Sequence, residues 1–318
     1  MKKKDLIAKL SRPALVLIIG IVLSILSPDF LTKTNILNVL RQSSLLLIMS
    51  LGMLYAMLLG RGLDLSIGAT LALSSCCSAM IMSQDPSNPA LTILGIAVGI
   101  AIGLLIGVVN GALVAYFSLP AMLVTYGTRQ IIRGIAFNSM SDKVITFFPR
   151  IISYIGTGRI LGISLPIWIA AVLTALVIFI LKKTAFGRRF FLVGANPSAA
   201  NFSGIDSKKT IVYGFMLNAL FATLAGFIYI GRLNAAEPQI GPDFHFNAIS
   251  ACAIGGVSMS GGSGDPLGVV CGAIILMLLQ NGLNLLGISA NWNALVQGAA
   301  IIIAVLMDFF ANRKSNKT

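Results

Sequence analysis

The chain has 318 residues, of which 57% are hydrophobic and only 10% are charged, and its formal net charge is +13. Soluble domains carry about 25% charged residues, so this composition excludes an ordinary soluble protein and indicates an integral membrane protein. A positive balance of this size would point to nucleic acid in a soluble chain. Here more than half of the 23 Lys and Arg lie beside the ends of apolar segments, so we expect no nucleic-acid partner.

Apolar segments follow one another along the whole chain. A bilayer core about 30 Å thick needs about 20 apolar residues per helix. Two segments are short or interrupted, at residues 122–137 and 247–259, and the stronger ones are 14–30, 43–60, 65–82, 91–117, 163–181, 211–231, 267–287 and 294–310. We therefore predict an all-α, polytopic membrane protein with about ten transmembrane helices in a single domain, residues 1–318.

The basic residues predict the topology. They gather in residues 1–13, 182–210 and 311–318, and short segments rich in Lys and Arg stay in the cytoplasm. We therefore expect the N-terminus, the central loop and the C-terminal tail on the cytoplasmic side. This arrangement requires an even number of crossings before and after the loop. Six segments precede the loop but only three strong ones follow it, so segment 247–259 is expected to supply a fourth.

Two of the crossings are predicted to be broken, one in each half of the chain. Residues 60–72 read GRGLDLSIGATLA, and residues 255–273 read GGVSMSGGSGDPLGVVCGA. Non-helical backbone survives at membrane depth only where it is buried in protein or lines a wet cavity. A pair of such breaks is typical of a transporter built from two related halves.

Asp64 lies in the first break, where a carboxylate needs a partner or water. It is either a gate or pathway residue, or a structural group that pairs with Arg61 or caps a helix starting at Leu65. Amides are more numerous, and their donors and acceptors suit a polyhydroxylated solute, although hydrogen bonding between helices is the alternative. These amides are Asn110, Asn138, Asn218, Gln280, Asn281, Asn284 and Gln297. As candidate pathway residues we select Asp64, Ser66, Asn281 and Asn284.

Catalytic and metal-binding patterns are missing from the sequence. The lone histidine, His245, is expected in an external loop, and the four cysteines lack metal-ligand spacing. No G-x-x-x-x-G-K-[ST] loop for ATP occurs. We therefore expect neither an enzyme nor a metal or cofactor bound by this chain. Because Asp64 is nearly alone in the membrane, energy is expected from a partner; an ion-coupled secondary carrier is the alternative function.

The central loop contains its own helix signals. Asn196 is a favoured N-cap, Pro197 suits the first helical position and Gly204 suits a helix end. They predict a short helix over residues 197–203, roughly 10 Å long. We expect Phe202 to anchor this helix to the membrane domain. The helix is either a well-capped connection or a docking element for a cytoplasmic partner.

Five motifs, in this order and spacing, are GLDLSIG (62–68), LPAMLVTYG (119–127), NPSAANFSGI (196–205), AIGGVSMSGGSG (253–264) and NGLNLLGI (281–288). With them the chain resembles, over essentially its full length, the permease subunits of bacterial ATP-binding-cassette sugar importers of the ribose, xylose, arabinose and allose type. The resemblance implies a multi-pass subunit of the bacterial inner membrane that pairs with a second permease, either a copy of itself or a related sister. It also implies cytoplasmic ATPase subunits that bind ATP and Mg²⁺, and an extracytoplasmic protein that delivers sugar.

The same resemblance assigns the ATPase-coupling helix to Asn196, Pro197, Ser198, Ala199, Ala200, Asn201, Phe202, Ser203 and Gly204. The family's typical Glu-Ala-Ala-Arg run is here Ser-Ala-Ala-Asn at 198–201, so both charges are missing. We therefore expect a packing contact with the ATPase through Ala199, Ala200 and Phe202. Relatives also tend to show Glu-Leu-Asp-Ala-Ile where residues 245–249 read His-Phe-Asn-Ala-Ile. Two carboxylates are thus absent from a segment expected at the outer mouth, which bears on the cargo and on the sister subunit.

Overall fold

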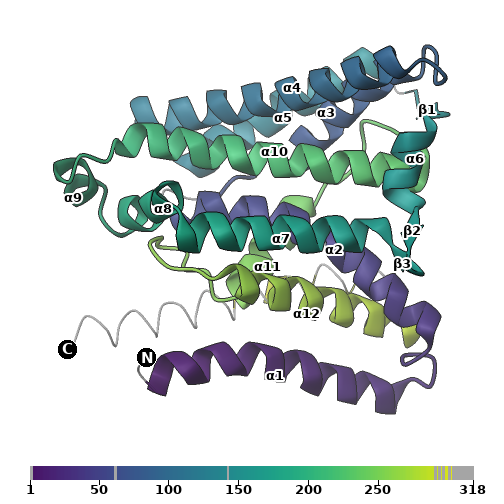
Figure 1. Ribbon diagram of the computed structural model, residues 1–318, viewed down its shortest axis with the longest axis horizontal. Coiled ribbons are helices and arrows are strands. Elements are labelled where there is room, and N and C mark those ends of the chain that lie inside the picture. The colour runs from purple at the N-terminus through teal and green to yellow at the C-terminus, as the bar shows by residue number, and fades with distance from the viewer. Residues whose placement is uncertain are drawn as a thin grey trace.

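The structure is a computed structural model, and it describes residues 3–60, 63–141 and 143–289 together with residues 292, 295, 298, 299 and 302. Long helices run side by side along the length of the molecule (Figure 1). In chain order they are α1 (Lys3–Leu26), α2 (Lys33–Leu58), α3 (Ile67–Met82), α4 (Pro89–Tyr116), α5 (Ala121–Met140), α6 (Arg150–Thr157), α7 (Leu165–Lys183), α8 (Ala185–Ala195), α9 (Pro197–Phe202), α10 (Ser207–Leu233), α11 (Phe244–Ile254) and α12 (Pro266–Leu285).

The all-helical prediction is confirmed for the described part of the chain, where the strands are only two residues long. Strand β1 (Ile145–Thr146) pairs antiparallel with β4 (Ala235–Ala236), and β2 (Arg159–Ile160) pairs antiparallel with β3 (Ile163–Ser164). These small ribbons and α6 lie at one end of the bundle, while α9 and the start of α1 lie at the other (Figure 1). We call these the ribbon end and the α9 end.

Several helices are long and apolar enough to cross a membrane. By length and composition they are α2, α4, α7, α10 and α12, and the described chain contains shorter apolar helices at Ser11–Leu26, Ile67–Met82 and Phe244–Ile254. The chain is therefore a polytopic membrane protein. The predicted crossing at residues 294–310 and the tail at residues 311–318 fall outside the described ranges, apart from the four positions 295, 298, 299 and 302. The count of ten crossings and the side on which each end lies stay predictions.

Segment 247–259 is not a full-length helix. Helix α11 has 11 residues, which at 1.5 Å per residue spans about half of a 30 Å bilayer core. It ends at Ile254, and non-helical backbone follows as far as Asp265, before α12 begins. The expected fourth crossing is thus a short helix joined to a glycine-rich loop.

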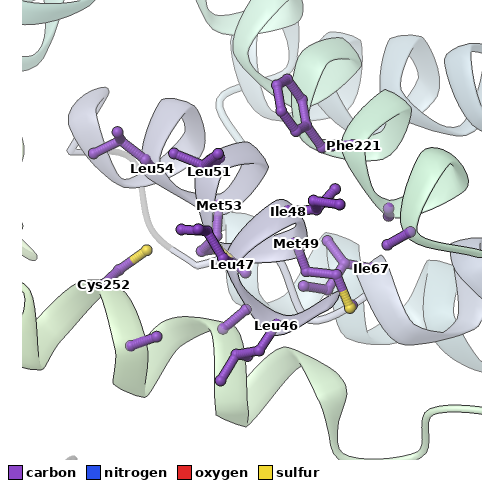
Figure 2. Close-up of a cluster of buried hydrophobic side chains, with 14 of the residues drawn as sticks. Leu46, Leu47, Ile48, Met49, Leu51, Met53, Leu54, Ile67, Phe221 and Cys252 are labelled. Carbon is purple, nitrogen blue, oxygen red and sulfur yellow. The ribbon is translucent and has the colours of Figure 1, made fainter. Parts of the chain in front are cut away.

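Helix α2 forms the centre of the bundle. Every residue from Ser43 to Leu58 is buried, as expected for a helix that is apolar on all sides. Figure 2 shows side chains of this stretch surrounded by Ile67 of α3, Phe221 of α10 and Cys252 of α11. Helix α10 in turn packs against α2, α3, α4 and α6. The two helices that follow the breaks therefore share one core with the long helices.

Candidate functional site

Helix α9 forms where its capping residues predict. The side chain of Asn196 accepts a hydrogen bond from the backbone N–H of Ala199 at 3.0 Å, and Gly204 has a φ of +79°, which favours glycine. The side chain of Asn201 then accepts hydrogen bonds from the backbone N–H and the hydroxyl of Ser207, the first residue of α10. The start of α10 is capped by Asp206, and the N–H that Lys209 donates to it holds the pKa of Asp206 below its usual value.

The prediction that Phe202 anchors α9 to the membrane domain is wrong. Ala200 is only 4% exposed, whereas Phe202 is 94% exposed, the largest value among the large hydrophobic side chains described. Residues two positions apart point to different faces of a helix, so burial of one exposes the other. Ala200 therefore holds α9 against its own chain, and the phenyl ring of Phe202 is free to contact another molecule.

The first break is held by a buried polar network. The carboxylate of Asp64 is 1% exposed and accepts hydrogen bonds from the backbone N–H of Ser66 at 2.8 Å, from its hydroxyl at 2.6 Å and from the amide of Asn218 at 2.9 Å. The amide of Asn110 donates to the same hydroxyl at 2.9 Å. Asn110 lies on α4 and Asn218 on α10, so Asp64 and Ser66 join the break to two long helices.

The structure tests one of the two structural interpretations of Asp64, its role as the cap of a helix that starts at Leu65. Arg61 lies outside the described residues, so the pair of Asp64 with Arg61 stays a prediction. Helix α3 starts at Ile67, not at Leu65, and its N-cap is Ser66. The backbone N–H of Leu65 instead donates a hydrogen bond of 3.0 Å to the hydroxyl oxygen of Thr125 on α5. Residues 63–66 are therefore a non-helical segment tied to α4, α5 and α10.

The other two candidate pathway residues lie elsewhere, on α12. Asn281 and Asn35 of α2 exchange amide hydrogen bonds of 3.0 Å and 2.7 Å. This is the hydrogen bonding between helices weighed above for such amides. Asn284, one turn on, is exposed. The structure thus separates Asp64 and Ser66 from Asn281 and Asn284.

A cavity of about 220 Å³ lies between four helices near the ribbon end. Its lining residues are Gln42, Leu45, Leu46 and Met49 of α2, Tyr229 and Arg232 of α10, Phe244 and Asn247 of α11, and Met277 and Gln280 of α12. None of the four pathway candidates belongs to this lining. Gln280 was one of the amides singled out in the sequence, whereas Gln42 and Arg232 carried no signal because they stand alone beside helix ends.

The two breaks contact each other through backbone. The N–H of Gly262 donates to the carbonyl of Leu58 at 2.8 Å. Gly60 has a φ of +63°, and a Cβ on it would overlap the carbonyl of Ser260. These contacts close the end of α2 onto the glycine-rich loop that follows α11.

The end of α8 enters the same contact. A Cβ added to Gly194 would overlap the carbonyl oxygen of Leu58 and lie 2.6 Å from the nitrogen of Gly262. Three chain segments therefore meet at Gly60, Gly194 and Gly262, which we call the glycine junction. Only Ala195 and Asn196 separate Gly194 from the first residue of α9. The sequence showed the glycines but not that α8 closes on them.

His245 does not lie in an external loop, as expected from the sequence. It is the second residue of α11, its side chain is fully buried, and neither ring nitrogen has a hydrogen-bond partner. Helix α11 starts earlier than predicted because Phe244 already packs on the ring of Tyr229, 5.6 Å between centroids. Among the residues that the structure describes, no group of three or more His, Cys, Asp and Glu is placed to hold a metal ion.

The long apolar helices, the paired breaks and the cavity between helices, with polar and apolar lining, are together typical of one class, a polytopic membrane permease. The chain belongs to the family described as "Branched-chain amino acid transport system / permease component", which matches residues 35–305. It is similar to the ribose import permease of Haemophilus influenzae, with 37% identity over 97% of this chain and 95% of the relative. The ribose import permease of Bacillus subtilis is 41% identical over 92% of this chain and 89% of its own length.

Relatives with other cargo names match over a similar length. The D-allose transport system permease of Escherichia coli K12 is 35% identical over 89% of this chain and 86% of its own length. No solved structure matches the chain.

Proposed function

We propose that this chain is the membrane-spanning permease subunit of an ATP-driven importer that moves a sugar of pentose or hexose size into the cytoplasm. The observation that carries the proposal is the near full-length similarity to permeases named for ribose and allose import. The family description names amino acids, but the relatives matched over most of their length are named for sugars. A cavity lined by three amides and an aromatic pair suits a sugar ring and its hydroxyls.

The partners in this proposal follow from what the chain offers. ATP and Mg²⁺ are bound by cytoplasmic ATPase subunits and not by this chain. A second permease, identical or a related sister, completes the pore, and an extracytoplasmic sugar-binding protein delivers cargo at the ribbon end. The chain crosses the bacterial inner membrane about ten times, with residues 1–13, the loop 182–210 and the tail 311–318 in the cytoplasm.

The coupling step runs through α9. The exposed ring of Phe202 enters a groove on the ATPase, as an apolar anchor in a pocket. Movement of α9 is passed through α8 to the glycine junction, because Gly194 packs against the backbone of Leu58, just before the first break, and of Gly262 in the second break. The breaks then rock relative to each other, and alternating access follows. The packing contact expected through Ala200 is replaced by one through Ala199 and Phe202, since Ala200 is buried.

The test is reconstitution in liposomes with a candidate ATPase and binding protein. We expect sugar uptake that requires ATP on the side of the liposome membrane where the ATPase is bound, and that is lost without this chain. The rival function, an ion-coupled carrier, predicts uptake by the purified chain alone under a proton or sodium gradient. Accumulation in that second arm, with none in the first, would replace the proposal by the rival.

A further inference from the structure

The cavity near the ribbon end carries unbalanced positive charge. Arg232 is the one charged residue in its described lining. The salt bridges among the described residues join Lys182 to Asp265 and Lys209 to Asp206, so none of them neutralises Arg232. A half-buried guanidinium without a carboxylate partner favours an anion beside it.

A second arginine strengthens this field. Arg41 of α2 lies within electrostatic reach of Arg232. One of its terminal nitrogens donates to the side chain of Asn38 at 3.0 Å, while its Nε is buried without a partner. Two like charges at partly buried positions repel each other unless a negative charge joins them. No lining side chain supplies that charge, and Glu237, which acts electrostatically on Tyr229, forms no salt bridge with either arginine among the described residues, so a ligand is the natural source.

The elements around the cavity add to the positive potential. Helix α11 begins with Phe244 and Asn247 on the cavity wall, so its positive dipole end lies there. Arg129 and Arg133 of α5 bind backbone carbonyls of the loop before α11, Arg129 that of Pro242 at 3.0 Å and Arg133 those of Pro238 and Ile240. Asp243 of this loop lies within electrostatic reach of Arg133 and offsets its charge, and neither the two arginines nor the acids Glu237 and Asp243 line the cavity, so the dipole end of α11 is what the surroundings add.

The rest of the lining fits a single sugar ring. A volume of about 220 Å³ equals roughly seven water molecules at ~30 Å³ each, close to a monosaccharide and below the usual size of a drug site. The edge-to-face pair of Tyr229 and Phe244 offers an apolar wall. Gln42 and Gln280 offer donors and acceptors, and the buried side-chain oxygen of Asn247 has no partner and accepts a hydroxyl.

We propose that this cavity binds a monosaccharide carrying a carboxylate, a sugar acid, with the planar guanidinium of Arg232 holding the carboxylate in a two-point contact. This inference rests on the proposed transport function and narrows its cargo. The amides and the aromatic pair hold the ring, and the two arginines set the preference for the anion over the neutral sugar of the same shape.

Binding to the purified full-length chain in nanodiscs tests the preference without any partner. The probes are D-galacturonate and D-galactose, which differ only at carbon 6. We expect galacturonate to raise the thermal unfolding midpoint and to bind about 10- to 100-fold more tightly than galactose, as a charge-assisted contact predicts. Arg232→Gln is expected to abolish the difference, and Arg232→Lys to restore part of it. Arg159→Gln, an exposed arginine at the same end, is the matched control and is expected to bind like the wild type.

The outcomes separate the two proposals. Equal binding of both sugars, or tighter binding of galactose, would overturn the sugar-acid inference and leave ATP-driven transport of a neutral sugar standing. Tight, Arg232-dependent binding of galacturonate with no ATP-driven uptake of either sugar would instead remove the transport function. Asn247→Asp guards against misfolding of the arginine variant, because it keeps Arg232 and neutralises its charge. It is expected to lower galacturonate affinity about 10-fold while the unfolding midpoint without ligand stays near that of the wild type.

Discussion

The two breaks are held in place by different kinds of contact, side-chain hydrogen bonds in the first and mostly backbone contacts in the second. The first, in its described residues 63–66, is fixed by side-chain hydrogen bonds, since Asp64, Leu65 and Ser66 bond to three different helices. The second, residues 255–265, is held along its glycine-rich part by backbone, with the N–H of Gly262 on the carbonyl of Leu58 and a turn closed by Ser258 and Ser263 at 3.0 Å; a side chain takes part only at its end, where Asp265 pairs with Lys182. Side-chain hydrogen bonds in a buried site fix one geometry, whereas glycine contacts lack interlocking side chains. The first break is therefore suited to be the pivot and the second the moving surface.

Loss of the carboxylate in the first break is expected to have the largest effect. Asp64→Ala leaves the Asn218 amide and the Ser66 hydroxyl without their buried acceptor, at a cost of about 3 kcal/mol. Asp64→Asn keeps an acceptor and should cost less. Thermal unfolding of the purified chain measures both. Asp85, an exposed carboxylate bonded to Ser87 in the loop before α4, gives the control Asp85→Ala. An Asp64→Ala protein as stable as the control would show that the first break is not the fixed one.

The glycine junction is expected to respond next. Gly194→Ala forces a Cβ into the carbonyl of Leu58, and overpacking of this kind costs about 1–3 kcal/mol. We expect ATP hydrolysis by the assembled transporter to continue while sugar uptake falls, because α8 no longer seats on the breaks. Gly134→Ala on α5, where a Cβ meets nothing within 4 Å, is the matched control. Coupled uptake unchanged in Gly194→Ala would rule out transmission through this contact.

A substitution of Phe202 tests the proposed contact between α9 and the ATPase. Phe202→Ala removes an exposed ring, so stability should not change, while affinity for the ATPase falls by about 2 kcal/mol if the ring is a central anchor. This affinity is measured by binding of the purified permease to the ATPase in detergent. Leu161→Ala, 88% exposed at the ribbon end, is the control. If Phe202→Ala binds the ATPase as tightly as Leu161→Ala does, the ATPase contact lies away from α9.

The smallest effect is expected at Thr125, which supports the first break from α5. Thr125→Val keeps the shape and removes the acceptor of the Leu65 N–H, at a cost of about 1 kcal/mol. Thr174→Val on α7 is the matched control, since that hydroxyl bonds only within its own helix. The unfolding midpoint of Thr125→Val should therefore be lower than that of Thr174→Val. A lower midpoint for Thr174→Val than for Thr125→Val would contradict side-chain control of the first break.

Local features were predicted well. The Asn196 and Pro197 start of α9, the glycine end at Gly204 and both breaks stand where their residues indicate. These depend on conformational preferences of a few neighbouring residues, which a sequence shows directly. Predictions that needed a helix face or a distant partner did less well. Phe202 was expected to point inward, and His245 was placed in a loop, because the residues that bury Ala200 and His245 are supplied by tertiary packing.

The amino-acid sequence by itself determined an apolar, helical, membrane-crossing chain with two breaks and one capped surface helix, because hydrophobic length and the backbone chemistry of Gly, Pro and Asn act locally. Only the tertiary structure decided which polar atoms meet. Asp64 finds Asn218, 154 positions away, and four helices together leave a cavity around Arg232. Such partners depend on the packing of whole helices, and no local pattern records it.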